Sequence, residues 1–325
     1  MVVGLVLVLV MAIALTACTD EAGPSELGEV QVVAADGATE TVDLGELTAY
    51  EGQGGFKKST GTMVGPSSYK GAKLSDVIAA AGDGMGDSAG VQVVAKDGYA
   101  LTLSLAQLDG GVMTYTPEGE ALSLGGVTAV LAYEQDGEAP FDGGPRLVFV
   151  SEQGAWTDGH FWIKEVDAIK FVASVDDWSI SMSGVESVTL DRATFESMVT
   201  CGTTPHPAIE YEMTEKDGST TVYAGAPLWL LLSMVDGGDA PGGHYEFNDA
   251  AAEAGYTVSV VAADGFAAEF EASRVARTSD ILVAYMADGE PLGGEDGPLK
   301  LVGDGLTSGK ERIKQIAEIK IEGIK

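Results

Sequence analysis

The chain has 325 residues and a formal net charge of −32, with 50 acidic residues against 18 Lys and Arg. Nucleic acid is therefore excluded as a partner, because binding to phosphates needs clustered basic side chains. Hydrophobic residues make up 45% of the chain and Gly occurs 44 times, which is typical of a globular protein with many turns. The length suffices for two domains of ordinary size.

The chain begins with an apolar segment, residues 2–17, that ends in small residues. It is shorter than the ~20 residues that span a bilayer, and its position is typical of a signal-peptide core. Residues 15–18, Leu-Thr-Ala-Cys, resemble the lipobox of bacterial lipoproteins. This resemblance implies cleavage before Cys18 and attachment of lipid to its thiol. The alternative is an ordinary signal peptide with a cysteine there by chance.

We therefore expect residues 1–17 to be a signal peptide and residues 18–29, which are polar with Gly and Pro, to be a flexible tether. The mature protein would then be exported and held by its lipid at the outer face of the cytoplasmic membrane. An acidic surface does not bind anionic headgroups, so the lipid is the expected means of attachment.

The rest of the chain repeats itself with a period of roughly 150 residues, which is typical of a duplicated domain. Four segments recur in the same order. The pairs are 69–74 with 223–228, 91–99 with 258–266, 131–138 with 283–290, and 163–171 with 313–321. We predict a first domain over residues 30–174 and a second over residues 175–325.

Each predicted domain contains several short strands, Gly-rich turns and few helices. Residues 91–99 and 258–266 alternate β-branched residues and then contain Asp-Gly, which predicts a hairpin in each. The apolar runs 77–81 and 229–234 predict short buried helices that follow a Gly-containing turn. The sequence therefore predicts two tandem copies of a mixed, mainly β domain of the α+β class.

These segments, in this order, resemble the oxidoreductase molybdopterin-binding domain of the sulfite oxidase family. Its G-x-P-L turn is matched at residues 225–228 and more loosely at 71–74. Its A-Y-x-x-(D/N)-G-x-P-L strand is matched best at residues 284–292, and its G-G-P-(L/V)-R-L-V strand at 143–148 and 297–302. The resemblance covers nearly all of the mature chain, once per copy, and implies the sulfite oxidase-like fold.

In that family one cysteine thiolate binds molybdenum, together with the dithiolene of the pterin. Cys201 lies at the corresponding place in the second copy, whereas the first copy has Gly54, Gly55 and Phe56 there. Once Cys18 carries lipid, Cys201 is the remaining cysteine, and molybdenum needs a soft sulfur ligand. The resemblance thus implies a molybdenum site at Cys201. The other interpretation is an inert, buried thiol.

The pterin carries a phosphate, so the resemblance also implies polar and cationic residues around the cofactor. His206, Arg274, Arg277, Lys310 and Lys314 are the candidates, and Arg192 and Arg312 are further basic residues of this copy. His206 lies between two prolines and equally suits an exposed turn.

Two functions remain open. The first is a molybdopterin-dependent oxidoreductase with a small-molecule substrate or an electron-transfer partner protein. The second is a lipoprotein that kept the fold, lost the cofactor and binds a ligand or a partner. The chain contains three His in all, and this thin supply of His and Arg favours the second function. The placement of Cys201 favours the first, which is the function that the resemblance predicts, with the second as the alternative.

Two other segments have competing interpretations. Residues 156–162 contain two Trp, one Phe and His160, and predict either a stacking platform for a ligand or, slightly favoured, an aromatic plug over the core. The acidic turn at residues 289–296 could supply oxygen ligands to calcium, but it lacks the spacing of an EF-hand, so a solvated turn is expected.

Overall fold

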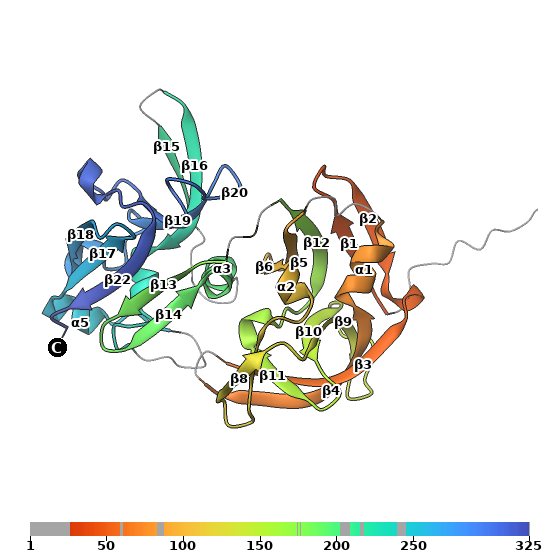
Figure 1. Ribbon diagram of the computed structural model, residues 1–325. Helices are drawn as coiled ribbons and strands as arrows, with labels where there is room; N and C mark the ends of the chain where they lie inside the picture. The colour runs from red at the N-terminus through yellow and green to blue at the C-terminus, as the bar shows by residue number, and fades with distance from the viewer. Residues whose placement is uncertain are drawn as a thin grey trace, which may run out of the picture.

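The computed structural model describes residues 27–58, 61–82, 88–173, 175, 177–201, 209–214, 218–238 and 245–324. The signal peptide, Cys18 and most of the tether fall outside these residues, so those predictions stay predictions. The described chain is mainly β, with mixed sheets and a few short helices, as expected for the α+β class (Figure 1). Within the described ranges, no helix is long and apolar enough to cross a membrane.

The first half, residues 27–173, contains two sheets. One has five strands in the order β2-β1-β12-β5-β6, and β1 and β12 are parallel neighbours in it. The other has seven strands in the order β10-β9-β4-β3-β11-β7-β8. The strands are β1 (Glu29–Val33), β2 (Thr39–Asp43), β3 (Ala49–Lys57), β4 (Met63–Lys73), β5 (Gly90–Ala95), β6 (Ala100–Ser104), β7 (Met113–Tyr115), β8 (Ala121–Leu124), β9 (Thr128–Gln135), β10 (Arg146–Val150), β11 (Ala155–Asp158) and β12 (Val166–Val172). The helices are η1 (Leu44–Glu46), α1 (Leu74–Ala80), α2 (Leu105–Leu108) and η3 (Gly159–Phe161).

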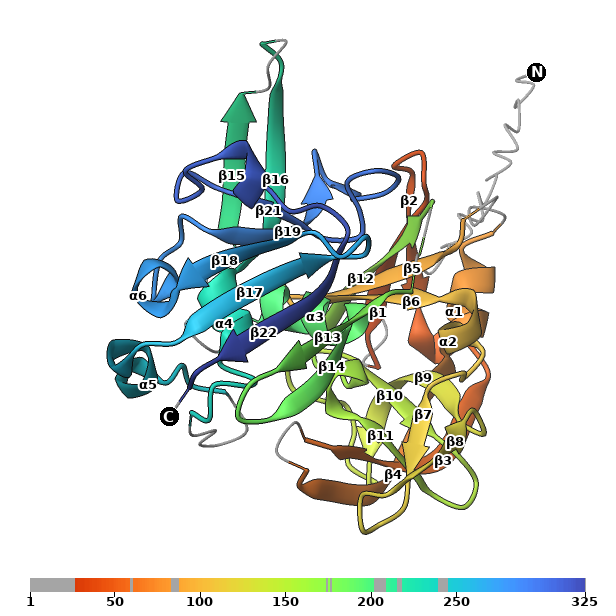
Figure 2. The same cartoon turned by 60° about the vertical axis from the view of Figure 1, so that its left-hand side comes forward.

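The second half, residues 175–324, also contains two described sheets. One has the order β14-β13-β22-β17-β18 with β13 and β22 parallel, and the other has the order β15-β16-β19-β20 with β21 paired to β19 (Figure 2). The strands are β13 (Ser179–Ser183), β14 (Ser187–Asp191), β15 (Ile209–Thr214), β16 (Thr220–Pro227), β17 (Thr257–Ala262), β18 (Ala267–Glu271), β19 (Leu282–Ala287), β20 (Glu290–Pro291), β21 (Lys300–Val302) and β22 (Ile316–Glu322). The helices are α3 (Arg192–Thr200), α4 (Leu228–Leu232), α5 (Asp249–Ala254), α6 (Ala272–Val275) and η5 (Gly309–Glu311).

The two halves share a topology. The order β14-β13-β22-β17-β18 matches β2-β1-β12-β5-β6, with the parallel pair at the same place. The strands β15, β16, β19 and β21 pair with one another as β3, β4, β9 and β10 do. β18 therefore takes the place at its sheet edge that β6 takes in the first half.

The predicted hairpins are confirmed, because β5 pairs antiparallel with β6 and β17 with β18. The Asp of each Asp-Gly turn accepts a hydrogen bond from a backbone N–H: Asp97 from Tyr99 and Asp264 from Phe266, both at 2.9 Å. This explains why the Asp recurs, since its side chain closes the turn that positions the edge strand.

The expected short helices are present as α1 and α4, and each follows a strand directly (Figure 2). Both therefore begin earlier than the apolar runs predict, at Leu74 and Leu228. The Gly before each helix lies at a bulge in an antiparallel strand pair, Gly71 where β4 pairs with β9 and Gly225 where β16 pairs with β19. A methyl group on Gly71 would overlap the carbonyl oxygen of Leu131, which explains why Gly is needed in this turn.

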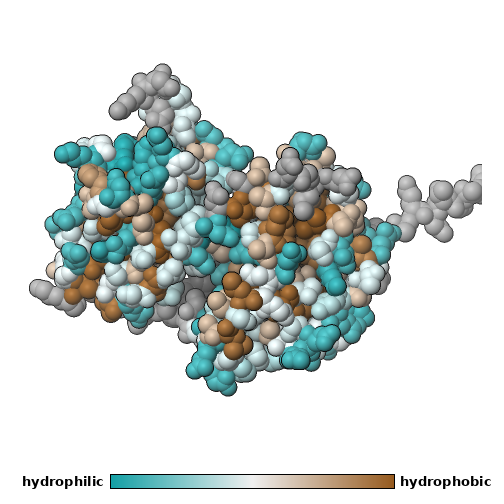
Figure 3. Space-filling model, viewed as in Figure 1, coloured by the Kyte–Doolittle hydropathy of each residue, from teal (hydrophilic) through white to brown (hydrophobic). Residues whose placement is uncertain are grey.

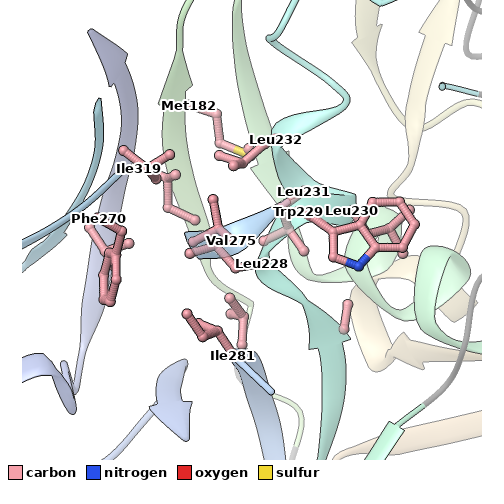
Figure 4. Close-up of a cluster of buried hydrophobic side chains, with 14 of the residues drawn as sticks. Met182, Leu228, Trp229, Leu230, Leu231, Leu232, Phe270, Val275, Ile281 and Ile319 are labelled. Atoms are coloured by element: carbon pink, nitrogen blue, oxygen red, sulfur yellow. The ribbon is translucent and has the colours of Figure 1, made fainter. Parts of the chain in front are cut away.

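Each half has its own hydrophobic core. All five residues of α4 are buried in the core of the second half, to which Ile319 of β22 and Phe270 of β18 also belong. Trp229 points to the opposite side from these two residues (Figure 4). The core of the first half includes one residue from the second, Ala193 of α3. This helix therefore lies where the halves meet.

Candidate functional site

Residues close together in the sequence explain why α3, the helix that ends at Cys201, forms. The carboxylate of Asp191 accepts a hydrogen bond from the Thr194 N–H at 2.8 Å and so caps the start of α3. Ala193, Phe195 and Val199 bury one face of the helix. Arg192, Glu196 and Thr200 follow one another at intervals of four residues, so they form a polar stripe along another face.

The polar stripe bonds to the edge of β6 in the first half. Glu196 Oε2 accepts a hydrogen bond from the Thr102 N–H at 2.8 Å. Thr200 Oγ1 accepts from the Ala100 N–H at 3.0 Å and donates to the Ala100 carbonyl oxygen at 2.9 Å. These side chains bond the outward backbone groups that an edge strand otherwise presents to solvent.

Arg192 completes this junction. Its side chain is 7% exposed and donates to the Thr102 carbonyl oxygen at 2.9 Å, to Glu196 at 3.1 Å and to Asp177 at 3.0 Å. Burial raises the pKa of Glu196 above its ordinary value, and the charge of Arg192 opposes this shift. The Arg192–Glu196 pair is thus a buried ion pair whose two members also bond to β6.

A cavity of about 290 Å³ lies at this junction and is lined from both halves. Its lining residues are Gln107, Asp177, Trp178, Ser179, Asp191, Arg192 and Ala193. Because Arg192 and Asp177 bind each other there, their charges are already matched.

Tyr99 lies beside the C-terminal part of α3. Its hydroxyl donates to the His160 carbonyl oxygen at 2.7 Å and lies 2.9 Å from Ser197 Oγ. Burial raises the pKa of Tyr99 well above its ordinary value, and the nearby Cys201 and Glu196 raise it further. The C-terminal end of α3 therefore packs against Tyr99.

Cys201 caps the C-terminus of α3 and is half-buried. Among the described residues it forms no disulfide. The structure thus brings the predicted metal ligand next to Tyr99 of the first half. His206 lies in residues 202–208, outside the part of the chain that the structure describes.

Two of the predicted cofactor-binding residues hold carboxylates of the second half. Arg274 of α6 makes two hydrogen bonds to Glu311, at 2.7 and 2.8 Å, and these lower the pKa of Glu311 to about 2. Arg277 binds Asp249 at 2.8 Å and lies over the ring of Trp229, 4.9 Å from its centroid. Both guanidinium groups thus serve the packing of helices within this half.

The two predicted lysines lie on the surface. Lys314 forms an ion pair with Asp296, which also binds the buried Lys300 at 2.7 Å. Lys310 is exposed in η5. Asp296, the last residue of the acidic turn considered for calcium, is therefore held by two lysines. Among the described residues, no group of three or more His, Cys, Asp and Glu could hold a metal ion.

These residues do not fit a phosphate-bearing pterin. The phosphate needs cations that are available to it, whereas Arg274, Arg277 and Lys314 each bind a carboxylate. The groups that the Tyr99 hydroxyl contacts beside Cys201 are the Ser197 hydroxyl and the His160 carbonyl oxygen, and neither supplies a positive charge.

The aromatic segment 156–162 packs as a plug. The ring of Trp162 lies 5.3 Å from Phe56 and 5.4 Å from Tyr69, and its indole N–H donates to Thr157 at 2.8 Å. Phe161 is buried against Phe149 in the core. These contacts favour the structural interpretation of this segment over a stacking platform.

The sequence indicates Arg192 only as a basic residue near the predicted site, and the polar stripe was not predicted from it. A signal was present, because Arg, Glu and Thr recur every four residues directly after a capping Asp. The sequence does not show that the stripe binds the edge of β6, because β6 lies about a hundred residues earlier in the chain.

No family model matches the chain, and no curated protein matches it. Among solved structures it is similar to the sulfane dehydrogenase SoxCD from Paracoccus pantotrophus, with 11% sequence identity and a TM-score of 0.35. This match covers 92% of the present chain and 78% of the other. The similarity is too low to assign a function.

Proposed function

We propose that the chain is an exported lipoprotein that binds a partner without a redox cofactor. Two like domains, derived from one another by duplication, would be held against each other by α3 and anchored to the membrane through Cys18. The shared topology of the halves supports the duplication. The repeated Asp-Gly turns at the same places in the sheets support it as well.

One observation carries the proposal. The helix that leads to Cys201 is occupied in joining the two halves, through Arg192, Glu196 and Thr200. Arg274, Arg277 and Lys314, three of the cations expected at a cofactor, are paired with carboxylates of the second half. Three of the residues predicted to bind the cofactor thus have structural partners within this half, which supports a binding function for the fold over a redox function.

Membrane attachment is proposed to depend on the lipid alone. On the face shown in Figure 3, hydrophobic residues form separate small patches among hydrophilic ones, and the net charge of −32 opposes binding to anionic lipid. In cell fractionation, the wild-type protein should sediment with membranes and Cys18→Ser should stay in the soluble fraction. Cys201→Ser, the matched control, should sediment like the wild type. Retention of Cys18→Ser in the membrane fraction would contradict the anchor.

A molybdenum site at Cys201 is the second candidate. The observation that favours it is that Cys201 is half-buried rather than fully enclosed and, within the described residues, has no disulfide. If a pterin were bound, this thiol would be the group of this chain that ligates the metal. The cofactor would then supply two-electron oxygen-atom transfer.

Metal analysis separates the two candidates. Protein purified from a host that makes the cofactor is expected to contain no stoichiometric molybdenum and no pterin fluorescence. Cys201→Ser should then unfold at the same temperature as the wild type, because a half-buried thiol and a hydroxyl differ little in size. Stoichiometric molybdenum that disappears in Cys201→Ser would overturn the proposal and establish the second candidate.

A further inference from the structure

Each half has a five-stranded sheet, and the outer edge strands of these two sheets can be compared. In the first half this edge is β6, and α3 covers it. In the second half the edge is β18, at the same place in the sheet (Figure 2). The turns that lead into the two strands match, since the Ala95 N–H bonds to the Tyr99 carbonyl oxygen and the Ala262 N–H to the Phe266 carbonyl oxygen, both at 2.8 Å.

This match fixes which backbone groups point outward. In an antiparallel pair, alternate residues direct their N–H and C=O groups toward the neighbour and away from it. Ala100 and Thr102 are the outward residues of β6, as their bonds to α3 show. Counted from the matching turns, the outward residues of β18 are Ala267 and Glu269. Both are exposed. The helices α6 and η5 contact β18, but among the described residues no helix side chain forms a hydrogen bond with Ala267 or Glu269 like those that α3 forms with β6.

An exposed aromatic residue adjoins this edge. Phe266 directly precedes β18 and is 50% exposed. It stands where Tyr99 stands in the first half, and there the aromatic ring is largely buried beneath α3. The second half therefore has an open strand edge and an uncovered aromatic side chain at the positions that bind a helix in the first half.

The charge of the second edge differs from that of the first. Asp264, Glu269 and Glu271 are all exposed around Phe266. Glu269 takes the position of Thr102, to which Glu196 of α3 binds in the first half. A helix like α3, with Glu at this position, could accept from the Glu269 N–H as Glu196 does from the Thr102 N–H, but it would also bring its carboxylate close to that of Glu269. A helix with Lys or Arg there would pair with Glu269 instead.

We propose that Phe266 and the outer edge of β18 bind a cationic helix of a partner protein. A side chain of the helix would cover Phe266, polar side chains at intervals of four residues would bond to the backbone of Ala267 and Glu269, and basic residues would face Glu269 and Glu271. A second copy of this chain is disfavoured as the occupant, because its net charge is −32 and its own α3 bears Glu196. This inference rests on the proposed function as a binding protein and names the class of partner.

The probe is a cross-linked helical peptide with the sequence of residues 191–201, carrying Glu196→Lys and Cys201→Ser. The control peptide carries Cys201→Ser alone. In NMR titrations of the full mature chain, the Lys peptide should shift the amide signals of Ala267 and Glu269, but not those of Ala100 and Thr102, which α3 already covers. It should bind about tenfold more tightly than the control peptide, since the attraction of Lys to Glu269 and Glu271 replaces a repulsion and outweighs the hydrogen bond that Glu196 could accept from the Glu269 N–H.

Two protein variants test the assignment. Phe266→Ala should weaken binding of the Lys peptide by about tenfold or more, because it removes the aromatic anchor, while Leu122→Ala, at another exposed apolar side chain, should not. Glu269→Lys should reverse the preference in favour of the control peptide. Equal binding of both peptides, signal shifts elsewhere, or self-association that Phe266→Ala abolishes would each overturn the proposal. Metal analysis tests the proposed function separately, so failure of the two can be told apart.

Discussion

Arg192→Ala is expected to lower the free energy of unfolding by about 3–5 kcal/mol, the cost of breaking a buried ion pair from one side. The side chains of Arg192 and Glu196 are 7% and 9% exposed, so the carboxylate that remains has no solvent to stabilise its charge. The variant also removes the hydrogen bond to the Thr102 carbonyl oxygen, at the edge of β6. Urea unfolding followed by circular dichroism measures this loss.

The controls separate a junction effect from a general effect of charge. Lys70→Ala removes an ion pair with Glu51 in which both side chains are exposed, and it should leave the free energy of unfolding unchanged. Arg192→Ala combined with Glu196→Gln should be less destabilised than Arg192→Ala, because the buried charge is gone. Amide hydrogen exchange at Ala100 and Thr102 should accelerate in Arg192→Ala. Unchanged hydrogen exchange at these two amides would contradict the proposal that α3 holds the two halves together.

The loss of unfolding free energy in Arg192→Ala should also depend on pH. Burial raises the pKa of Glu196 in the folded protein, and Arg192 is the charge that opposes the shift, so its removal raises this pKa further. A group with a raised pKa in the folded state contributes most to stability below its unfolded pKa, and this contribution is lost as pH rises through the folded value. The difference between variant and wild type should therefore be smallest below pH 4.5, the ordinary value for Glu, and increase toward neutral pH. A difference that is the same at acid and neutral pH would show that Glu196 is not the titrating group.

Local features of the fold could be predicted from the sequence. The hairpins at β5–β6 and β17–β18 depend on alternating apolar residues and an Asp-Gly turn, both of which are contained in nine consecutive residues. The helices α1 and α4 follow from short apolar runs after a Gly. Such features depend on neighbours in the chain, so the sequence alone contains the information for them.

The junction could not be predicted in the same way. Arg192 binds Thr102, and Glu196 binds the same residue, across a separation of more than ninety positions. A basic residue near a cysteine equally suits a phosphate site, and that is how sequence reasoning interpreted the basic residues of this half. Arg274 and Arg277 show the same ambiguity, because their partners Glu311 and Asp249 become neighbours only in the folded sheet. A basic residue can be recognised from the sequence, but the carboxylate that binds it cannot, because the two are far apart in the chain.

Gly225→Ala is expected to destabilise the second half by about 3 kcal/mol, because the added methyl group has no room. It would overlap the carbonyl oxygen of Val283 and come within 2.7 Å of Ala284 Cα, both of which belong to the backbone of β19 and cannot rotate away. Gly71→Ala should have a similar effect in the first half, where the carbonyl oxygen of Leu131 takes the same place. Gly309→Ala is the matched control, since no atom lies within 4 Å of its added methyl group, and it should leave the protein as stable or slightly more so. Thermal unfolding of the three variants measures these effects. If Gly225→Ala were as stable as Gly309→Ala, the close approach of the paired strands β16 and β19 would not be the reason that both halves have Gly in this turn.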